Sequence, residues 1–354
     1  MARWNIHNVS VRGVSACVPK EVVHTEDFSF FDKEGAEVFN NTVGIRERRL
    51  GPDSLCASDM CQAAAEKLIA ELGWEKESID MLVFESVTAD FHPTPPTSCL
   101  LQDRLGLSED CFCLDIPMGC CGCMYAMNVA GNMLSNGNIK RALVLIGDTA
   151  LRMGSMQDKS RVPLFGDMGT AVALEYDTTA EPILIDFHTQ GSGYKALMTP
   201  HGGFRHPMTP KSFVQEDFGN GILRAPKDTL IDGMAVFTFA ISKPAKTVAN
   251  LIEELGIDRE NDIDYYLIHQ ANKLIVDRLV KKLKLPVEKV PYNLESFGNT
   301  GGASVPGLMV TRLREQLQQD KPHRLLCSSF GLGLSWGTML LNVKNLVIPK
   351  LIEI

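Results

Sequence analysis

The sequence Asp-Ile-Pro-Met-Gly-Cys-Cys-Gly-Cys-Met-Tyr occupies residues 115–125 and marks the turn around which the fold is organised. An apolar approach leads to Cys120, and Gly122 is followed by the small and apolar run 124–130, which predicts a buried helix. This is a strand, a turn and a helix, with a thiol at the turn. Unpaired backbone N–H groups and the positive end of the helix dipole favour a thiolate at such a position, so we expect the pKa of Cys120 to be lowered.

Two other interpretations of this cysteine compete with a nucleophile. Cysteine is one of the most frequently buried residue types, so packing alone explains many thiols in small-residue stretches. Residues 111, 113, 121 and 123 are also cysteines, and such a cluster could bind a metal. It lacks paired C-x-x-C spacing and a nearby histidine, so we expect no metal. The choice between packing and chemistry depends on the rest of the chain.

Length and composition are those of an ordinary globular protein. The chain has 354 residues, 45% hydrophobic and 22% charged, and its length fits two domains better than one. The formal net charge of -8 argues against a nucleic-acid partner, because phosphate contacts need a basic surface. No charged, apolar leader and no apolar run of bilayer length is present, so we expect a cytoplasmic protein without a membrane partner. The ten cysteines are then expected to be reduced thiols.

Strand and helix patterns alternate along the chain. Alternating apolar residues at 4–11 predict one opening strand, followed by turn signals at Gly13 and Pro19. Apolar residues spaced by three and four predict a helix over 58–72. The short apolar runs 79–84, 142–146 and 171–174 predict buried strands. Alternation of this kind predicts an α/β protein with a largely parallel sheet.

The second half of the chain repeats the order of the first. Residues 72–84 and 255–268 both contain Leu-Gly, then Ile-Asp, then an apolar run. Cys120 lies 15 residues after Leu105, and Asn299 lies 16 residues after Leu283. We infer two similar α/β halves, residues 1–176 and 177–354. Cys120 and Asn299 then occupy corresponding turns and could face one cleft between the halves.

Two further residues join Cys120 as candidates. His269 follows the apolar run 265–268, where side chains at the end of a strand point into the ligand crevice of an α/β sheet. Asn299 lies in the glycine-rich stretch 297–304. Each has an ordinary alternative, a buried or surface histidine and a turn or cap residue. Three such residues on glycine-flanked turns at corresponding places favour a site over packing.

At this point the sequence resembles the β-ketoacyl-acyl-carrier-protein synthase III family, condensing enzymes of the thiolase fold. The resemblance runs almost end to end and rests on six motifs in order. They are Gly44-Ile45-Arg46-Glu47-Arg48, the Cys120 stretch with Gly122 and Tyr125, Phe165-Gly166-Asp167, His269-Gln270-Ala271-Asn272, Gly298-Asn299-Thr300 with Ala303-Ser304-Val305-Pro306, and Phe330-Gly331-x-Gly333-x-x-Trp336-Gly337. It implies two duplicated βαβαβ-type, thiolase-like halves packed as a layered α-β-α-β-α sandwich.

The resemblance also assigns roles. The family's triad falls on Cys120, His269 and Asn299, and its oxyanion hole on the backbone N–H groups of Cys120 and Leu332. Cys120 is expected to take an acyl group from a thioester, and neutral His269 and the Asn299 amide to stabilise the enolate formed when malonyl-acyl-carrier protein loses carbon dioxide. The product is a 3-oxoacyl-acyl-carrier protein, as at the start of fatty acid biosynthesis. Substrate-binding positions fall on Thr94, Phe330, Gly331 and Gly333.

The partners follow from the same resemblance. They are an acyl thioester, carried by coenzyme A or by a carrier protein, malonyl-acyl-carrier protein, and a second copy of the chain in a homodimer. No cofactor is expected, because the thioester carries the activated group. The acidic carrier protein needs a basic docking face, which the predicted helix after His269 offers at Lys273, Arg278, Lys281 and Lys282, around an apolar stripe of Ile275, Leu279 and Leu283.

Departures from the family pattern leave an alternative open. Relatives primed by coenzyme A hold its adenine with an aromatic residue and an arginine, and the aligned positions here are Val38 and Thr42. An aromatic residue that closes the partner's acyl pocket aligns with Thr94, and the loop 194–227 is long for the family. These features favour a specialised-pathway condensing enzyme or acyltransferase with a carrier-bound or longer donor. A Cys-His-Asn hydrolase and a binding protein without catalysis fit the sequence less well.

Overall fold

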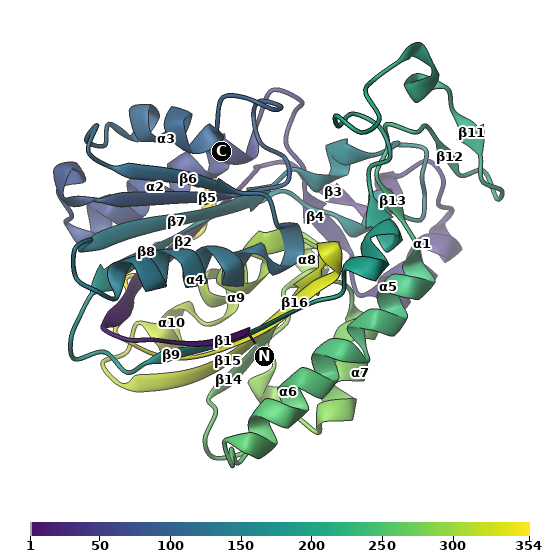
Figure 1. Cartoon of the computed structure of the whole chain (residues 1–354). Helices are drawn as coiled ribbons and strands as arrows, with labels where there is room; N and C mark the ends of the chain where they lie inside the picture. The colour runs from purple at the N-terminus through teal and green to yellow at the C-terminus, as the bar shows by residue number, and fades with distance from the viewer. Residues whose placement is uncertain (1) are drawn as a thin grey trace.

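Two β-sheets and three layers of helices alternate through the molecule (Figure 1). The computed structural model describes residues 2–354. One sheet has six strands in the order β17-β2-β8-β7-β5-β6, and the other has five in the order β1-β9-β16-β15-β14. Helices lie outside each sheet and between the two. This is the α-β-α-β-α sandwich predicted from the sequence.

The six-stranded sheet is mixed rather than largely parallel as predicted. β5 pairs in parallel with β6 and β7, whereas β8 is antiparallel to β7 and to β2. The chain between β7 and β8 contains only short 3₁₀ turns, so no crossover helix returns it to a parallel position. The strands are β2 (Val9–Val18), β5 (Met81–Glu85), β6 (Phe112–Ile116), β7 (Arg141–Asp148), β8 (Met168–Tyr176) and β17 (Ile352–Glu353).

The five-stranded sheet is also mixed. β14 pairs in parallel with β15, and β15, β16, β9 and β1 are antiparallel in turn. β15 and β16 are joined by the tight turn 332–334, which is too short for anything but an antiparallel connection. The strands are β1 (Ala2–Ile6), β9 (Ile183–Thr189), β14 (Tyr265–Ile268), β15 (Pro322–Gly331) and β16 (Ser335–Lys344).

The opening stretch, predicted as one strand over 4–11, forms two strands in different sheets. Asn8 has a φ of 61° and turns the chain between β1 and β2. Gly13, predicted as a turn, lies inside β2 at a shift in register, where a Cβ would lie 2.5 Å from the Val347 carbonyl oxygen. Periodicity continued across the break, so it did not reveal the change of sheet.

The helices form three layers. α2 (Ala57–Leu72) and α3 (Thr97–Leu105) cover the six-stranded sheet, and α6 (Lys243–Glu254) and α7 (Lys273–Leu283) cover the other (Figure 1). α4 (Gly122–Leu134) and α9 (Ser304–Arg312) lie between the sheets. The remaining helices are α1 (Lys33–Val43), α5 (Gly233–Ala240), α8 (Leu294–Phe297) and α10 (Arg314–Leu317). Within residues 2–354, no helix is both long and apolar enough to cross a membrane.

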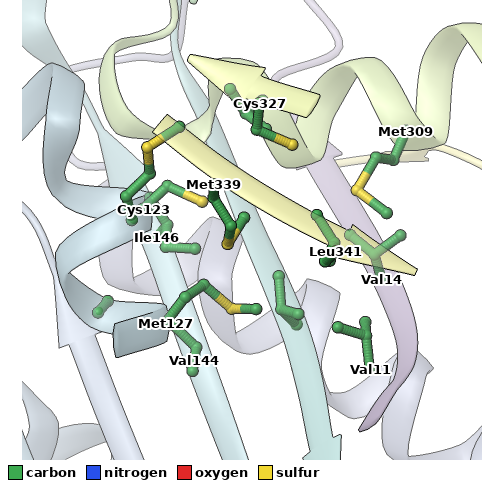
Figure 2. Packing of buried hydrophobic residues seen from close by; sticks show 14 of the residues in the cluster. Val11, Val14, Cys123, Met127, Val144, Ile146, Met309, Cys327, Met339 and Leu341 are labelled. Carbon is green, nitrogen blue, oxygen red and sulfur yellow. The ribbon is translucent and has the colours of Figure 1, made fainter. Parts of the chain in front are cut away.

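The predicted helix over 58–72 is confirmed as α2, and it ends at Gly73, whose φ of 64° suits glycine. The central layer packs against both sheets in one core. Figure 2 shows Met127 of α4 near Val144 of β7, and Met339 and Leu341 of β16 in the same cluster. Sulfur-bearing side chains fill much of this layer. Their unbranched shapes adapt to the irregular space between helix and sheet.

The segment 191–231 extends away from the sandwich as an arm (Figure 1). It contains the short pairs β10 (Leu197–Met198) with β13 (Leu230–Ile231) and β11 (Glu216–Asp217) with β12 (Leu223–Arg224). Its tip exposes aromatic side chains, with Phe204 88% accessible. A further small pair, β3 (Val22–His24) with β4 (Glu47–Arg49), lies beside α1.

We propose that the two sheets mark two related halves, residues 1–176 and 177–354. In each half a short 3₁₀ turn precedes a central helix: residues 119–121 precede α4, and residues 301–303 precede α9. Each end of the chain joins the sheet of the other half: β1 belongs to the five-stranded sheet and β17 to the six-stranded sheet.

Candidate active site

A cavity of about 490 Å³ lies where the central helices begin, and Cys120, His269 and Asn299 all line it. Cys120 comes from the turn before α4, His269 from the end of β14, and Asn299 from the turn before α9. The three residues are far apart in the chain, and the facing of the two halves brings them to one cavity. The juxtaposition predicted from the sequence is thus present.

Cys120 lies in the turn 119–121 between β6 and α4, with Gly119 at a φ of 60°. The loop after β15 passes directly over the thiol. A Cβ at Gly331 would lie 2.6 Å from the Cys120 Cβ and 3.1 Å from its Sγ. Only glycine allows the backbone this close, and Gly331 and Leu332 therefore line the cavity beside Cys120.

The pKa of Cys120 is raised to about 12 by burial and, in smaller part, by the nearby carboxyl groups of Asp148 and Glu85. The expectation of a lowered pKa was therefore wrong. The favourable position before α4 is present, but removal from water and two buried carboxyl groups outweigh it. The thiol rests protonated at neutral pH, and its proton has to leave as the sulfur attacks.

His269 is held by its backbone and by its ring. Its N–H donates to the Ser328 carbonyl at 2.8 Å, and Nδ1 lies 2.7 Å from the Ser304 hydroxyl. The edge of the ring meets Phe330, with ring centroids 5.4 Å apart. Burial lowers the pKa of His269 to about 4, so the ring is neutral at physiological pH.

Ser304 bears on the tautomer of His269. The Gln270 N–H donates to the Ser304 oxygen at 3.4 Å, and the serine hydroxyl can in turn donate its own proton to Nδ1. A neutral ring that accepts at Nδ1 carries its proton on Nε2. Sequence reasoning missed this role of Ser304, although the residue lies in the motif 303–306 quoted for the resemblance.

Asn299 is fixed by the segment that contains the Phe165-Gly166-Asp167 motif. Its N–H donates to the Leu164 carbonyl at 2.8 Å, and its carbonyl accepts from the Gly166 N–H at 3.1 Å. The side-chain Oδ1 accepts from the Gly301 N–H at 3.0 Å. This bond orients the amide and leaves Nδ2 as a donor for a ligand in the cavity.

The other predicted contact residues divide into two groups. Phe330, Gly331 and Leu332 line the cavity, whereas Gly333 and Thr94 are absent from its lining. Thr94 lies in the exposed loop between β5 and α3.

An apolar wall completes the cavity, and the sequence did not predict it. Helix α5 contributes Met234, Val236 and Phe237, and the base of the arm contributes Leu197 and Ile231. Met234 is 75% accessible and stands at the mouth. The continuous apolar run of α5 could have signalled a helix buried between a core and a ligand. A wall of this kind fits an aliphatic chain.

Of the four basic residues of α7 predicted to dock a carrier protein, two are engaged by other groups of the described chain and two are not. Lys273 pairs with Asp277 one turn along the helix, and the Lys282 Nζ donates to the Ile241 carbonyl at 2.8 Å. Arg278 and Lys281 are exposed and form no ion pair within residues 2–354. The apolar stripe of Ile275, Leu279 and Leu283 is buried in the core, so it holds the helix rather than a partner.

The cysteines beside Cys120 pack in the interior. All ten cysteines are free. Cys121 and Cys123 are buried, and Figure 2 shows Cys123 packed near Ile146 and Met339 in the central core. Within residues 2–354, no group of three or more His, Cys, Asp or Glu side chains is placed to hold a metal ion.

Comparison with known proteins identifies the same family in two parts of the chain. The model for 3-oxoacyl-[acyl-carrier-protein (ACP)] synthase III matches residues 114–193, which include Cys120. The model for the C-terminal part of that enzyme matches residues 252–343, which include His269 and Asn299.

Three relatives match over nearly the whole chain. The β-ketoacyl-[acyl-carrier-protein] synthase III of Rhodopirellula baltica is 31% identical over 95% of this chain and 99% of its own. That of Phocaeicola vulgatus is 31% identical over 94% of this chain and 96% of its own. The crystal structure of a 3-oxoacyl-(acyl-carrier protein) synthase from Burkholderia xenovorans superposes with a TM-score of 0.92, at 34% identity and 99% coverage of both chains.

The lowered pKa of His269 predicts a loss of stability in acid. The unfolded ring takes up a proton below its ordinary value of 6.5 and the folded ring only below about 4, so stability is full above pH 6.5 and falls between 6.5 and 4. The loss is about 3 kcal/mol by this linkage. Urea unfolding at several pH values should show this loss of unfolding free energy in the wild type and not in His269→Gln. Parallel curves for the two proteins would contradict a buried neutral His269.

Proposed function

Because this chain belongs to the 3-oxoacyl-[acyl-carrier-protein] synthase III family, we propose that it is an acyl-transferring condensing enzyme that works through an acyl-Cys120 intermediate. It joins an acyl thioester to malonyl-acyl-carrier protein with loss of carbon dioxide. The observation that carries the proposal is the content of the cavity: a thiol, a neutral imidazole and a primary amide against an apolar wall. The thiol suits a nucleophile, and the neutral imidazole and the amide suit an uncharged pair of donors to an enolate.

In the first step, Cys120 exchanges with the donor thioester. Its sulfur attacks the carbonyl carbon, the donor sulfur leaves, and the proton lost from Cys120 ends on the released thiol. The intermediate oxyanion needs backbone donors beside the thiol. Cys120 and Leu332 are the proposed pair, and their closeness is supported by the glycine contact between residue 331 and the Cys120 side chain.

In the second step, the malonyl carboxylate leaves as carbon dioxide and its bonding electrons form an enolate. The His269 Nε2–H and the Asn299 Nδ2 donate to the enolate oxygen. The carbanion then attacks the acyl carbon, and Cys120 leaves as a thiolate that regains a proton. Neutral donors suit this step, because a proton delivered by an imidazolium would quench the carbanion before it attacks.

A carrier-bound or longer acyl donor is a second candidate, favoured by the surface around the mouth. Val38 and Thr42 are both exposed on α1, and Val38 is 60% accessible. Neither side chain can stack on a purine, and neither carries a positive charge for a phosphate. The apolar wall from α5 and the arm supports an aliphatic acyl group. This variant belongs to the same family chemistry, in a specialised pathway rather than primary fatty acid synthesis.

The homodimer is proposed from the free edge of the six-stranded sheet. β6 is the edge strand, and its Phe112 is 44% accessible, whereas every residue of the neighbouring β5 is buried. An exposed edge with an aromatic side chain is suited to pairing with a second copy. The loop with Thr94 follows β5 on the same side. The ten free cysteines support a reducing, cytoplasmic location.

The acyl-enzyme is tested by mass spectrometry. Incubation with acyl thioesters of several chain lengths, on coenzyme A and on a carrier protein, should add the acyl mass at Cys120. Cys120→Ala should lose the adduct and the condensation yet keep decarboxylation of a malonyl thioester. His269→Ala and Asn299→Ala should keep the adduct and slow decarboxylation about 100-fold. Absence of an adduct from every donor would reject the covalent mechanism.

The tautomer of His269 gives a separate prediction. Ser304→Ala should slow malonyl decarboxylation about tenfold, since one neutral hydrogen bond at Nδ1 is lost and Nε2 no longer carries the proton in every molecule. Acylation of Cys120, followed by mass, should stay within about threefold of wild type. Ser304→Thr keeps the hydroxyl and serves as the control. If both substitutions slow both reactions alike, Ser304 supports the fold and not the ring.

Carrier-protein docking is tested at the two exposed cations of α7. Arg278→Glu with Lys281→Glu should raise KM for a carrier-bound substrate about tenfold at low salt, with a smaller effect at high salt. Turnover of a small free thioester should not change. The matched control is Lys67→Glu with Lys344→Glu, two exposed lysines on α2 and β16. An equal loss with both substrates would show that α7 is not the docking face.

A further inference from the structure

Glu85 is a buried carboxylic acid that the proposed mechanism does not use. It ends β5, has no accessible surface, and does not line the cavity. Neither of its carboxyl oxygens has a hydrogen-bond partner of good geometry in the described residues. A buried polar group in this condition is costly, so its presence needs a reason.

Two glycines enclose the Glu85 side chain. A Cβ at Gly122 would overlap its Cδ and Oε1, and a Cβ at Gly302 would overlap its Oε2. Gly122 begins α4 two residues after Cys120, and Gly302 lies three residues after Asn299. One oxygen of the carboxyl group thus rests against the nucleophile turn and the other against the amide turn.

We propose that Glu85 is a positioning residue that sets the separation between the Cys120 turn and the Asn299 turn. The inference rests on the proposed function, because it concerns the two groups between which the acyl group and the enolate have to meet. Condensation needs both turns at once. Acylation uses the Cys120 turn alone, and decarboxylation uses His269 and the Asn299 turn alone.

Asp148 supports the neighbouring turn and adds to the effect of burial on the charge of Glu85. Its Oδ1 accepts from the Val87 N–H at 2.9 Å and the Ser86 hydroxyl at 3.1 Å, and a Cβ at Gly301 would lie 2.6 Å from its Oδ2. Burial, and then the charge of Asp148, raise the pKa of Glu85 well above its usual range. The backbone N–H groups of Gly119 and Met118 lower this pKa, but by less. Glu85 therefore holds its proton at neutral pH, and glutamine reproduces the shape and the neutrality of this protonated side chain.

The proton on Glu85 also matters for the chemistry. An ionised Glu85 would place a second negative charge below the sulfur and oppose the thiolate that leaves when the carbon–carbon bond forms. Loss of the proton in alkali should therefore slow condensation. The titratable groups that face Glu85 come from β7, the nucleophile turn with α4, and α2, and they are Asp148, Cys120, Cys121, Cys123 and Cys61.

The experiment compares Glu85→Ala and Glu85→Gln in three assays: acyl mass added at Cys120, decarboxylation of a malonyl thioester, and full condensation. Glu85→Ala should lower condensation about tenfold or more and each half-reaction less than about threefold, because only condensation depends on the spacing. Glu85→Gln should restore condensation to within about threefold of wild type. Equal losses in all three assays, or a glutamine variant as impaired as the alanine variant, would overturn the inference.

A pH profile keeps the test decisive if Glu85→Ala does not fold. Wild-type condensation should fall in alkali with Glu85 charged, and Glu85→Gln should keep its rate to a higher pH. Coincident alkaline limbs would overturn the inference. Failure of the proposed function is a different result, since the wild-type protein would then form no acyl adduct and decarboxylate no malonyl thioester.

Discussion

The close approach of two turns, one before α4 and one before α9, is the contact on which the rest of the structure depends. A Cβ at Gly302 would lie 3.0 Å from the Gly119 carbonyl oxygen and would overlap the Glu85 Oε2, so the two backbones approach closely beside the buried Glu85 side chain. The glycine at 331 does the same for the loop after β15. The central helices, the facing sheets and the cavity are arranged so that these three backbone segments converge on one thiol.

This convergence explains which parts the sequence could predict. The turn before α4, the strand before His269 and the glycine-rich turn at Asn299 are each encoded by neighbouring residues, so pattern alone located them. The expected pKa of Cys120 was wrong because the pKa depends first on burial and then on Asp148 and Glu85, which come from other strands. No local pattern contains that information. The resemblance implied a neutral His269, whereas the lowered pKa of Cys120 was expected from the helix terminus alone.

The misplaced elements have the same cause. The opening alternation of apolar residues is real, yet the break at Asn8 assigns its two parts to different sheets, a choice made by the C-terminal half of the chain. The share of parallel strand pairs was overestimated. Helices and strands do alternate, but the connections on either side of β8 and β16 lack a crossover helix, so these strands pair antiparallel. The wall from α5 was missed because an apolar run does not say whether it faces a core or a ligand.

Charge in the site is kept low by burial, and this constrains the chemistry more than the identity of the triad does. The thiol, the imidazole and the acid at Glu85 all rest in their neutral forms, because each is buried where a charge is costly. Charge is then created only during reaction, on the sulfur and on the enolate oxygen, next to donors already in place. Preorganised neutral donors in an apolar cavity stabilise such a transient charge without stabilising the resting state equally. The apolar wall of the cavity lies elsewhere, on α5 and the base of the arm. Those elements pack at the margin of the sandwich, so they can vary in sequence without moving the glycine contacts that hold the reacting groups.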